Sequence, residues 1–254
     1  MLGRTALITG GGAGIGAATA RLFCQEGASV MLVDRDVAAL AATGQALGAA
    51  HPEARVLTAV AELADEAAVA AAVATAVAAF GGLDVLVNNA AMRHPVSVAE
   101  AQAEDWQAVV GVNLIGSAGC CKAALPALRA SGRGSIVNVS SCYAVTGRKG
   151  MGLYDATKAA LLALTRTLAF EEAAHGVRAN AVCPGSTLTD FHLARAAAAG
   201  KSVEQLKTER HDTSLIQRWA TPEEIAWPIL WLSSAEASFI TGTTLMVDGG
   251  LSIM

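Results

Sequence analysis

The stretch Thr5-Ala6-Leu7-Ile8-Thr9-Gly10-Gly11-Gly12-Ala13-Gly14-Ile15-Gly16 predicts the fold of this chain. Residues 4–9 are apolar and partly β-branched, which is typical of a short buried strand. The apolar-periodic run 17–25 after the glycines predicts a helix. Glycines let a backbone approach a pyrophosphate, and a helix N-terminus offers free N–H groups and the positive end of its dipole. We therefore expect a phosphate-binding unit here, the alternative being a tight turn without a ligand.

The residue after the next predicted strand indicates which phosphate compound is bound. Residues 29–33 end in Asp34, about 20 residues after the glycines, where a carboxylate can bind the adenosine ribose of a dinucleotide. Asp34 would repel a 2′-phosphate and accept a hydrogen bond from a free 2′-hydroxyl. Arg35 follows directly and could meet a phosphate, so NADP stays open. The charge argument favours NAD.

Strand and helix patterns alternate along the rest of the chain. Strands are expected at residues 4–9, 29–33, 55–60, 83–87, 134–140, 177–183 and 243–247, and helices at 17–25, 37–47, 65–80, 105–129, 152–175, 188–210 and 221–233. This alternation predicts an α/β fold, a single-domain doubly wound parallel sheet of Rossmann type with helices on both faces. The domain spans 1–254, with a cofactor half at about 1–140 and a catalytic and substrate half at about 141–254.

Three residues mark expected breaks or starts of the predicted helices. Pro126 is expected to kink or end the helix at 105–129, and Gly200 to break the helix at 188–210. Thr221, followed by Pro222 and by Glu224 at the capping-box position, predicts the start of the last helix.

Composition excludes several classes of function. The 254 residues are 53% hydrophobic and 16% charged, with a net charge of −4 and no basic stripe, so a nucleic-acid partner is not expected. The five cysteines lack metal-ligand spacing, which predicts reduced thiols and no metal site. The longest candidate membrane segment, residues 67–80, is too short to span, and no secretion signal is recognised. We expect a cytoplasmic protein without a membrane partner.

Tyr154 and Lys158 stand four residues apart in the helix predicted at 152–175, on one helical face. An ammonium group beside a phenol favours the ionised phenolate, so the pair can act as a general acid/base for an alcohol or carbonyl. A surface tyrosine beside a solvated lysine has the same spacing, and the rest of the chain decides between them.

Six motifs together resemble those of the short-chain dehydrogenases/reductases. They are Thr9-Gly10 with Gly14 and Gly16, Asn88-Asn89-Ala90, Ser140-Ser141, Tyr154 with Lys158, Pro184-Gly185, and Thr241-Gly242 with Asp248-Gly249-Gly250. The resemblance spans nearly the whole chain and keeps the family's order and spacing. It implies an oxidoreductase that transfers a hydride between NAD(H) and a secondary alcohol or ketone, and a homotetramer.

The resemblance also implies roles for single residues. Tyr154 matches the catalytic acid/base, and Lys158 the residue that favours its ionised form and holds the nicotinamide ribose. Ser141 matches the serine that binds the substrate oxygen, and Asn113 the asparagine that holds a relay water. The implied cofactor-binding residues are Gly10, Gly14, Ile15, Gly16, Asp34, Arg35, Glu62, Leu63, Asn89, Ala90, Tyr154, Lys158, Pro184, Gly185, Thr187 and Thr189.

Some of these residues have structural alternatives. Asn113 could satisfy backbone groups in a helix, Ser141 could cap a strand end, and Asn89 could be a hydrogen-bonding residue at the end of the sheet. Glu62 stands where the family usually has an aspartate that contacts adenine, which leaves that contact open.

The substrate is a small molecule whose identity the sequence leaves open. Candidate substrate contacts are Arg93, His94, Cys142, Arg148 and Met151. Arg93, His94, Arg148 and also Lys149 could anchor an acidic substrate, or they could be solvated loop charges. The stretch 189–215 suits a mobile lid. Two other functions remain open, an NADPH-dependent 3-oxoacyl carrier-protein reductase and a non-catalytic dinucleotide sensor.

Overall fold

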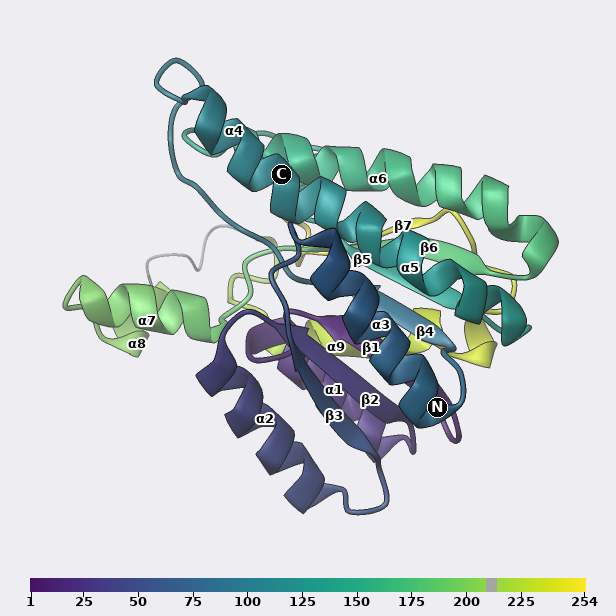
Figure 1. Cartoon of the computed structure of the whole chain (residues 1–254). Coiled ribbons are helices and arrows are strands. Elements are labelled where there is room, and N and C mark those ends of the chain that lie inside the picture. Colours follow the sequence, from purple (N-terminus) through teal and green to yellow (C-terminus); the bar gives the residue numbers. More distant parts are fainter. Residues whose placement is uncertain (209–213) are drawn as a thin grey trace.

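The computed structural model describes residues 1–208 and 214–254, and these form a seven-stranded parallel sheet in the order β3-β2-β1-β4-β5-β6-β7 (Figure 1). The strands are β1 (Thr5–Thr9), β2 (Ser29–Asp34), β3 (Val56–Val60), β4 (Val85–Asn88), β5 (Ser135–Val139), β6 (Arg178–Pro184) and β7 (Thr244–Val247). The predicted doubly wound parallel sheet is confirmed. The strand order reverses between β1 and β4, and ligands of such sheets bind at the carboxyl ends beside this switch point.

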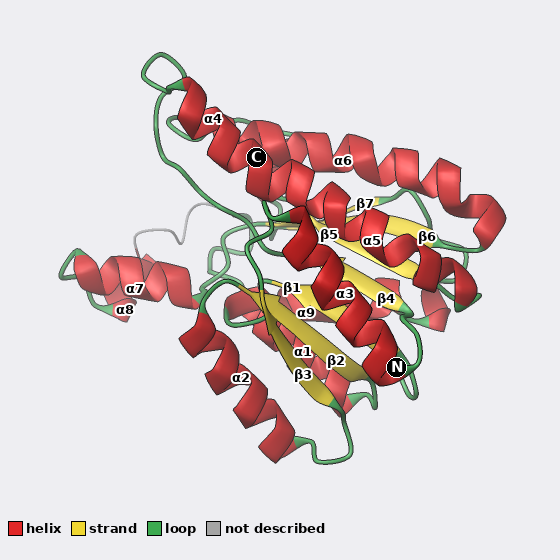
Figure 2. Cartoon of the chain, in the orientation of Figure 1, coloured by secondary structure: helices red, strands yellow, loops and turns green. Residues whose placement is uncertain are grey.

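Helices cover both faces of the sheet (Figure 2). Alternate β1 residues point to opposite faces, so Ala6 and Ile8 belong to one core cluster and Leu7 to another. The first cluster is closed by α1 (Gly14–Gln25), α2 (Val37–Ala50) and α9 (Pro222–Ser233). The second is closed by α3 (Glu66–Phe80), α5 (Ser117–Ala130) and α6 (Gly152–Glu172).

The last helix begins as its sequence predicts. The backbone N–H of Thr221 donates to the Glu224 carboxylate at 2.9 Å, and the backbone N–H of Glu224 donates to the Thr221 hydroxyl at 3.4 Å. Pro222 occupies the first turn, where a missing N–H costs nothing. The predicted capping box is confirmed.

The helix predicted at 105–129 is more complex than expected. It consists of α4 (Ala103–Val110), a π-helical turn (Gly111–Gly116) and α5. Pro126 does not end it, because α5 continues to Ala130. A proline frees the carbonyl four residues earlier, and that residue, Lys122, is exposed, where water can satisfy the carbonyl.

The same helix corrects the sequence-based estimate of the longest apolar segment. Ala103–Ala130 is long and apolar enough to cross a membrane by length and composition, unlike residues 67–80. A single such helix is weak support for a span, since core helices pass the same test. Here Val109, Cys121 and Leu128 are buried inside the protein.

The segment after β6 forms two short helices, α7 (Asp190–Ala198) and α8 (Val203–Thr208), which stand out from the sheet in Figure 1. The chain breaks between them at Gly200, whose φ is +68°, as predicted. The predicted end of this helical region at residue 210, and part of the expected lid at 189–215, lie outside the described residues.

Candidate active site

The glycine turn brings the N-terminus of α1 against the ends of β1 and β4. Gly10 and Gly14 have φ values of +65° and +54°, which only glycine adopts without strain. A Cβ on Gly16 would overlap the carbonyl oxygen of Gly10, and one on Gly10 would lie 2.8 Å from Nδ2 of Asn89. The turn therefore needs glycine for its close packing.

Asn89 holds this turn in place. Its side-chain amide donates to the carbonyl oxygens of Thr9 at 2.9 Å and Gly10 at 3.1 Å. The backbone N–H groups of Asn89 and Ala90 donate to the Thr9 hydroxyl at 3.0 and 3.1 Å. Asn89 therefore has the structural role that the sequence left open, at the end of the sheet. Its contact with a cofactor stays a prediction.

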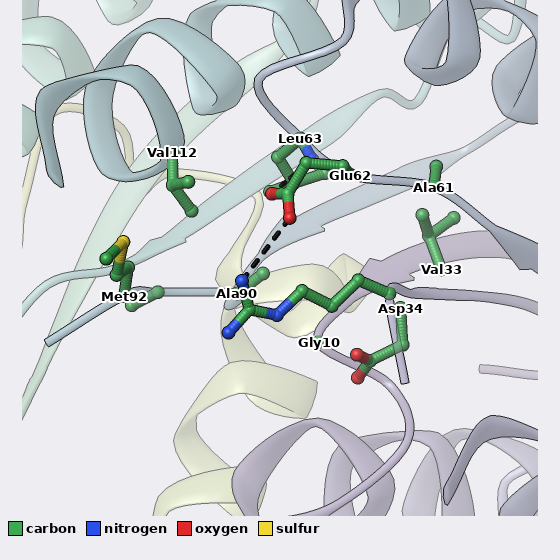
Figure 3. Close-up of a pocket in the computed structure, with 11 residues that line it drawn as sticks. Gly10, Val33, Asp34, Ala61, Glu62, Leu63, Ala90, Met92 and Val112 are labelled. Carbon is green, nitrogen blue, oxygen red and sulfur yellow. Dashed lines mark hydrogen bonds and ion pairs between the residues drawn. The ribbon is translucent and has the colours of Figure 1, made fainter. Parts of the chain in front are cut away.

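A cavity at the carboxyl ends of β1 to β4 brings together six of the residues predicted to bind cofactor (Figure 3). They are Gly10, Asp34, Arg35, Glu62, Leu63 and Ala90. Sequence reasoning missed five others that line it, because nothing in their local pattern separates them from core residues: Val33, Ala61, Ala91, Met92 and Val112. Apolar walls with a carboxylate at the side suit an adenosine, because the flat faces of its base pack against apolar side chains and its ribose hydroxyls need acceptors.

Charged side chains at this cavity contact one another. In Figure 3 a dashed line marks the ion pair between Nη1 of Arg35 and Oε2 of Glu62, at 3.3 Å. The other Glu62 oxygen accepts from the backbone N–H of Leu63 at 3.0 Å. The Asp34 oxygens accept from the backbone N–H groups of Gly12 at 3.0 Å and Asp36 at 3.1 Å. Arg35 thus has its own carboxylate partner, and Asp34 is held by the backbone.

The loop after β6 meets the glycine turn from the other side. Of the predicted residues, Pro184 ends β6 and the loop carries Gly185, Thr187 and Thr189, the last of which is the N-cap of α7. Asp190 in the first turn of α7 accepts a hydrogen bond from the backbone N–H of Gly14 at 2.9 Å. The N-terminus of α1 thus attracts an anion, as a phosphate site should. No pattern in the sequence pointed to Asp190.

Tyr154 and Lys158 occupy the first two turns of α6, and both are buried, at 5% and 2% exposure. Nζ of Lys158 lies 5.6 Å from the centroid of the Tyr154 ring and donates to the carbonyl oxygen of Val139 at 2.6 Å. Burial lowers the pKa of the Lys158 ammonium, and Tyr154 acts in the opposite direction. The pair is therefore not a solvated surface pair.

The two serines after β5 differ in what they contact. The Ser140 hydroxyl donates to the carbonyl oxygen of Lys158 at 2.6 Å and so ties β5 to α6. Ser141 caps the short turn Cys142–Ala144, and its hydroxyl accepts from the backbone N–H of Tyr143 at 3.2 Å. A hydroxyl that accepts can still donate, so the capping role and the predicted substrate contact are compatible.

Asn113 is fully buried in the π-helical turn. Its side-chain oxygen accepts from the backbone N–H of Met92 at 2.7 Å, and its amide donates to the Met92 carbonyl and the Thr157 hydroxyl, both at 3.0 Å. Both amide hydrogens are used, so Asn113 fixes the chain after β4 to α6. Asn113 therefore satisfies backbone groups, which was its structural alternative. Its role in holding a relay water stays a prediction.

Three of the five candidate substrate contacts are engaged elsewhere. His94 pairs with Asp105, with Nε2 and Oδ1 3.1 Å apart. Arg148 pairs with Asp155 at 2.9 Å, and its Cζ lies 3.9 Å from the centroid of the Tyr143 ring. Cys142 is completely buried, which removes it from a substrate's reach and raises the pKa of its thiol to about 11.

The remaining two candidate substrate contacts, Met151 and Arg93, are at least partly accessible to solvent. Met151 is half-buried and immediately precedes α6. Arg93 is exposed, with Cζ 5.1 Å from the centroid of the Tyr154 ring and Nη1 3.3 Å from Nε2 of His192. Within the described ranges, no three His, Cys, Asp or Glu side chains gather in a way that could hold a metal ion.

Comparison with known proteins gives consistent matches over the whole chain. The family described as Enoyl-(Acyl carrier protein) reductase matches residues 10–252. The chain is 38% identical to Short chain dehydrogenase/reductase astE of Aspergillus oryzae, over 99% of this chain and 96% of that protein. It is 40% identical to the cis-4-hydroxycyclohexanecarboxylate dehydrogenase of Sinomonas cyclohexanicum, over 97% and 96%.

Solved structures share the fold. The L-sorbose reductase of Gluconobacter frateurii, complexed with NADPH and L-sorbose, has a TM-score of 0.94 and 32% identity, over 100% of this chain and 98% of that one. The 3-ketoacyl-(acyl-carrier-protein) reductase of Brucella melitensis, complexed with NADH, has a TM-score of 0.88 and 33% identity, over 99% of both chains. These similarities extend across the glycine turn, the cavity and α6.

Proposed function

The chain belongs to the short-chain dehydrogenases/reductases, oxidoreductases that act on CH–OH groups, and we propose that Tyr154 is its acid/base for a secondary alcohol or ketone. The observation that carries this role is the burial of Tyr154 and Lys158 on one face of α6, with Lys158 donating to the carbonyl of Val139, the last residue of the strand that precedes Ser141. A buried phenol next to a buried ammonium is placed to exchange a proton with a substrate out of bulk water.

The proposed mechanism assigns one task to each side chain. In the oxidising direction, Ser141 holds the substrate oxygen by a hydrogen bond and Tyr154 takes the hydroxyl proton. Lys158 favours the ionised form of Tyr154, and its anchorage on the Val139 carbonyl fixes the distance between them. The nicotinamide supplies the hydride chemistry when it is bound. In reduction, Tyr154 returns the proton to the oxygen.

We propose NAD as the preferred cofactor. The two solved relatives carry NADPH and NADH, so the preference has to be argued from this chain's own residues. Asp34 presents a carboxylate at the end of β2, and Arg35 is paired with Glu62 at 3.3 Å. A 2′-phosphate would therefore meet a negative charge, while the neighbouring positive charge is already compensated.

The test of the mechanism is Tyr154→Phe. Calorimetric titration with NADH should give the wild-type affinity, while turnover falls by roughly 10²–10⁴-fold, the usual contribution of a general acid/base. The first substrates to assay are cis-4-hydroxycyclohexanecarboxylate and L-sorbose, taken from the names of the relatives. Near-normal turnover by the variant would remove Tyr154 from the proposed role.

The 3-oxoacyl carrier-protein reductase stays the second candidate, because a solved relative bears that activity. Tighter binding of NADPH than NADH, together with reduction of acetoacetyl carrier protein, would favour it. The sensor alternative is set aside, since the relatives are named dehydrogenases and reductases. A homotetramer, which the family resemblance implies, and a cytoplasmic location, which the cysteine pattern of the sequence predicts, complete the proposal.

A further inference from the structure

Three cationic side chains surround the ring of Tyr154. The Cζ atoms of Arg93 and Arg148 lie 5.1 and 5.3 Å from its centroid, and Nζ of Lys158 lies 5.6 Å from it. The whole chain has a net charge of −4, so this concentration of positive charge is local. The surroundings of each cation decide whether its charge is available to a substrate.

Two of the three cations have partners within the protein. Arg148 is largely buried against Asp155, with side-chain exposures of 21% and 10%, and makes two-pronged hydrogen bonds to that carboxylate. Lys158 is buried and donates to the Val139 carbonyl. The charges of Arg148 and Lys158 are therefore not available to bind a carboxylate of the substrate.

Arg93 differs from both. Its side chain is exposed, and within residues 1–208 and 214–254 it makes no ion pair with a carboxylate. Two aromatic rings and an imidazole hold the guanidinium instead. Its Cζ lies 5.1 Å from the centroid of Tyr154 and 5.4 Å from that of Phe191, and Nη1 lies 3.3 Å from Nε2 of His192. Cation–π contacts orient an arginine without neutralising its charge.

The backbone that carries Arg93 is also fixed relative to α6. Asn113 bonds both the N–H and the carbonyl of Met92, the residue before Arg93, and donates as well to Thr157 in α6. The backbone just before Arg93 is thus tied to α6 through Asn113, rather than being part of a free loop. A guanidinium presented in this way matches the two oxygens of a carboxylate.

We propose that Arg93 is the carboxylate-binding residue of the substrate site, and that the substrate is an acidic secondary alcohol or the corresponding oxo acid. This inference rests on the proposed function, because it assumes that the reacting oxygen lies at Tyr154. The carboxylate binds at Arg93 while the hydroxyl or carbonyl oxygen reaches Tyr154 and Ser141. Of the other basic residues that the sequence offered as anchors, His94 and Arg148 are excluded by their own carboxylate partners. Lys149 is exposed, but among the described residues it makes no contact with the ring of Tyr154.

The test separates charge recognition from chemistry by using ligands that cannot react. Protein saturated with NADH is titrated by calorimetry with acetate, butyrate and cyclohexanecarboxylate, each compared with its uncharged amide. Wild type should bind at least one carboxylate about tenfold or more tightly than its amide, the effect of one charge-assisted hydrogen-bonded pair. Arg93→Met should abolish the difference, and Arg93→Lys should keep part of it.

A matched control accounts for the loss of one positive charge. Arg195 is an exposed arginine of α7, so Arg195→Met changes the net charge equally and should leave the preference for carboxylates unchanged. A role for Arg93 only in ionising Tyr154 would not move the affinity for unreactive carboxylates. Equal binding of acid and amide in every pair, or an unchanged preference in Arg93→Met, would overturn the inference.

The same titrations separate this inference from the proposed function. Failure to bind either NADH or NADPH, or to turn over any alcohol or ketone, would contradict the proposed function itself. A protein that binds NADH and turns over neutral alcohols, yet shows no preference for carboxylates, would contradict only the assignment of Arg93.

Discussion

At the scale of single residues, Glu62 has contacts in the structure that differ from the adenine contact expected at its position. The family usually has an aspartate that reaches adenine, whereas the longer Glu62 pairs with Arg35 and accepts from Leu63. Both partners are partly exposed, so the pair contributes little to stability, but a 2′-phosphate would have to compete with Glu62 for Arg35. We therefore expect Glu62 to influence cofactor choice by keeping Arg35 occupied.

Glu62→Gln should raise the affinity for NADPH by a few-fold, up to roughly tenfold, with little change for NADH, because it frees Arg35 to meet a 2′-phosphate. Calorimetric titration with both dinucleotides measures the ratio. The double variant Arg35→Ala/Glu62→Gln is the control and should lose the gain. An unchanged ratio in Glu62→Gln would mean that Arg35 does not face the ribose.

Lys158 provides a prediction on pH. Burial lowers its pKa in the folded state below the ordinary value of 10.5, so the unfolded chain binds the proton more tightly. Stability should therefore rise with pH from the folded-state pKa up to about the ordinary lysine value, as unfolded chains lose the protons that folded chains already lack.

The measurement is the free energy of unfolding in urea across the alkaline range, for wild type and Lys158→Met. The difference between the two proteins isolates the lysine from the cysteines and tyrosines that also titrate there. We expect wild type to gain stability relative to the variant as pH rises. A constant difference would show that Lys158 titrates alike in both states.

At the scale of elements, the packing of α1 against the glycine turn sets a steric demand that α2 lacks. A Cβ on Gly16 would overlap the Gly10 carbonyl, whereas a Cβ on Gly48, in the last turn of α2, would meet nothing within 4 Å. Gly16→Ala should cost about 1–3 kcal/mol of stability, as overpacking does. Gly48→Ala should gain about 0.5–1 kcal/mol, because alanine loses less conformational entropy in a helix.

Thermal or urea unfolding of the two variants provides the comparison. Glycine to alanine is thus expected to lower the free energy of unfolding at Gly16 and to raise it at Gly48. Because both positions are helical, the comparison controls for helix propensity. Gly16→Ala should also weaken NADH binding, since the phosphate turn would have to shift. A Gly16→Ala protein with wild-type stability and affinity would show that the turn has room that the structure does not show.

At the scale of the whole molecule, the outer face of α5 and α6 is a candidate surface for self-association. A groove between the two helices is lined by Cys121, Leu125, Pro126, Leu164 and Leu168, among others. Phe170 on α6 is 88% exposed, an unfavourable position for a large aromatic ring in water. A face of this kind agrees with the homotetramer that the family resemblance implies.

Light scattering should give the wild-type protein a mass about four times the 25.7 kDa of one chain. Phe170→Asp should lower that mass, because burying a carboxylate between subunits is costly. Circular dichroism and NADH binding check that the variant stays folded. A wild-type mass of one chain would contradict the tetramer.

The sequence by itself determined the fold and the positions of the residues proposed for the acid/base pair. The alternation of strands and helices, the glycine turn, Asp34 at the end of β2, and Tyr154 with Lys158 on one helical face are local patterns, and each was found where it was expected. Such patterns depend on hydrophobic period and on spacing within one element, which neighbours along the chain specify.

Only the tertiary structure decided how the charged side chains are paired. Arg35 and Glu62 are 27 positions apart, and Arg93 and His192 are 99 apart. Sequence patterns offered Arg93, His94, Arg148 and Lys149 as candidates, and packing gave His94 and Arg148 carboxylate partners while it left Arg93 and Lys149 exposed. Only Arg93 of these two exposed residues lies against the ring of Tyr154 among the described residues. The physical reason is that a charge interaction depends on distance in space, and the packing of helices and loops on the sheet sets that distance.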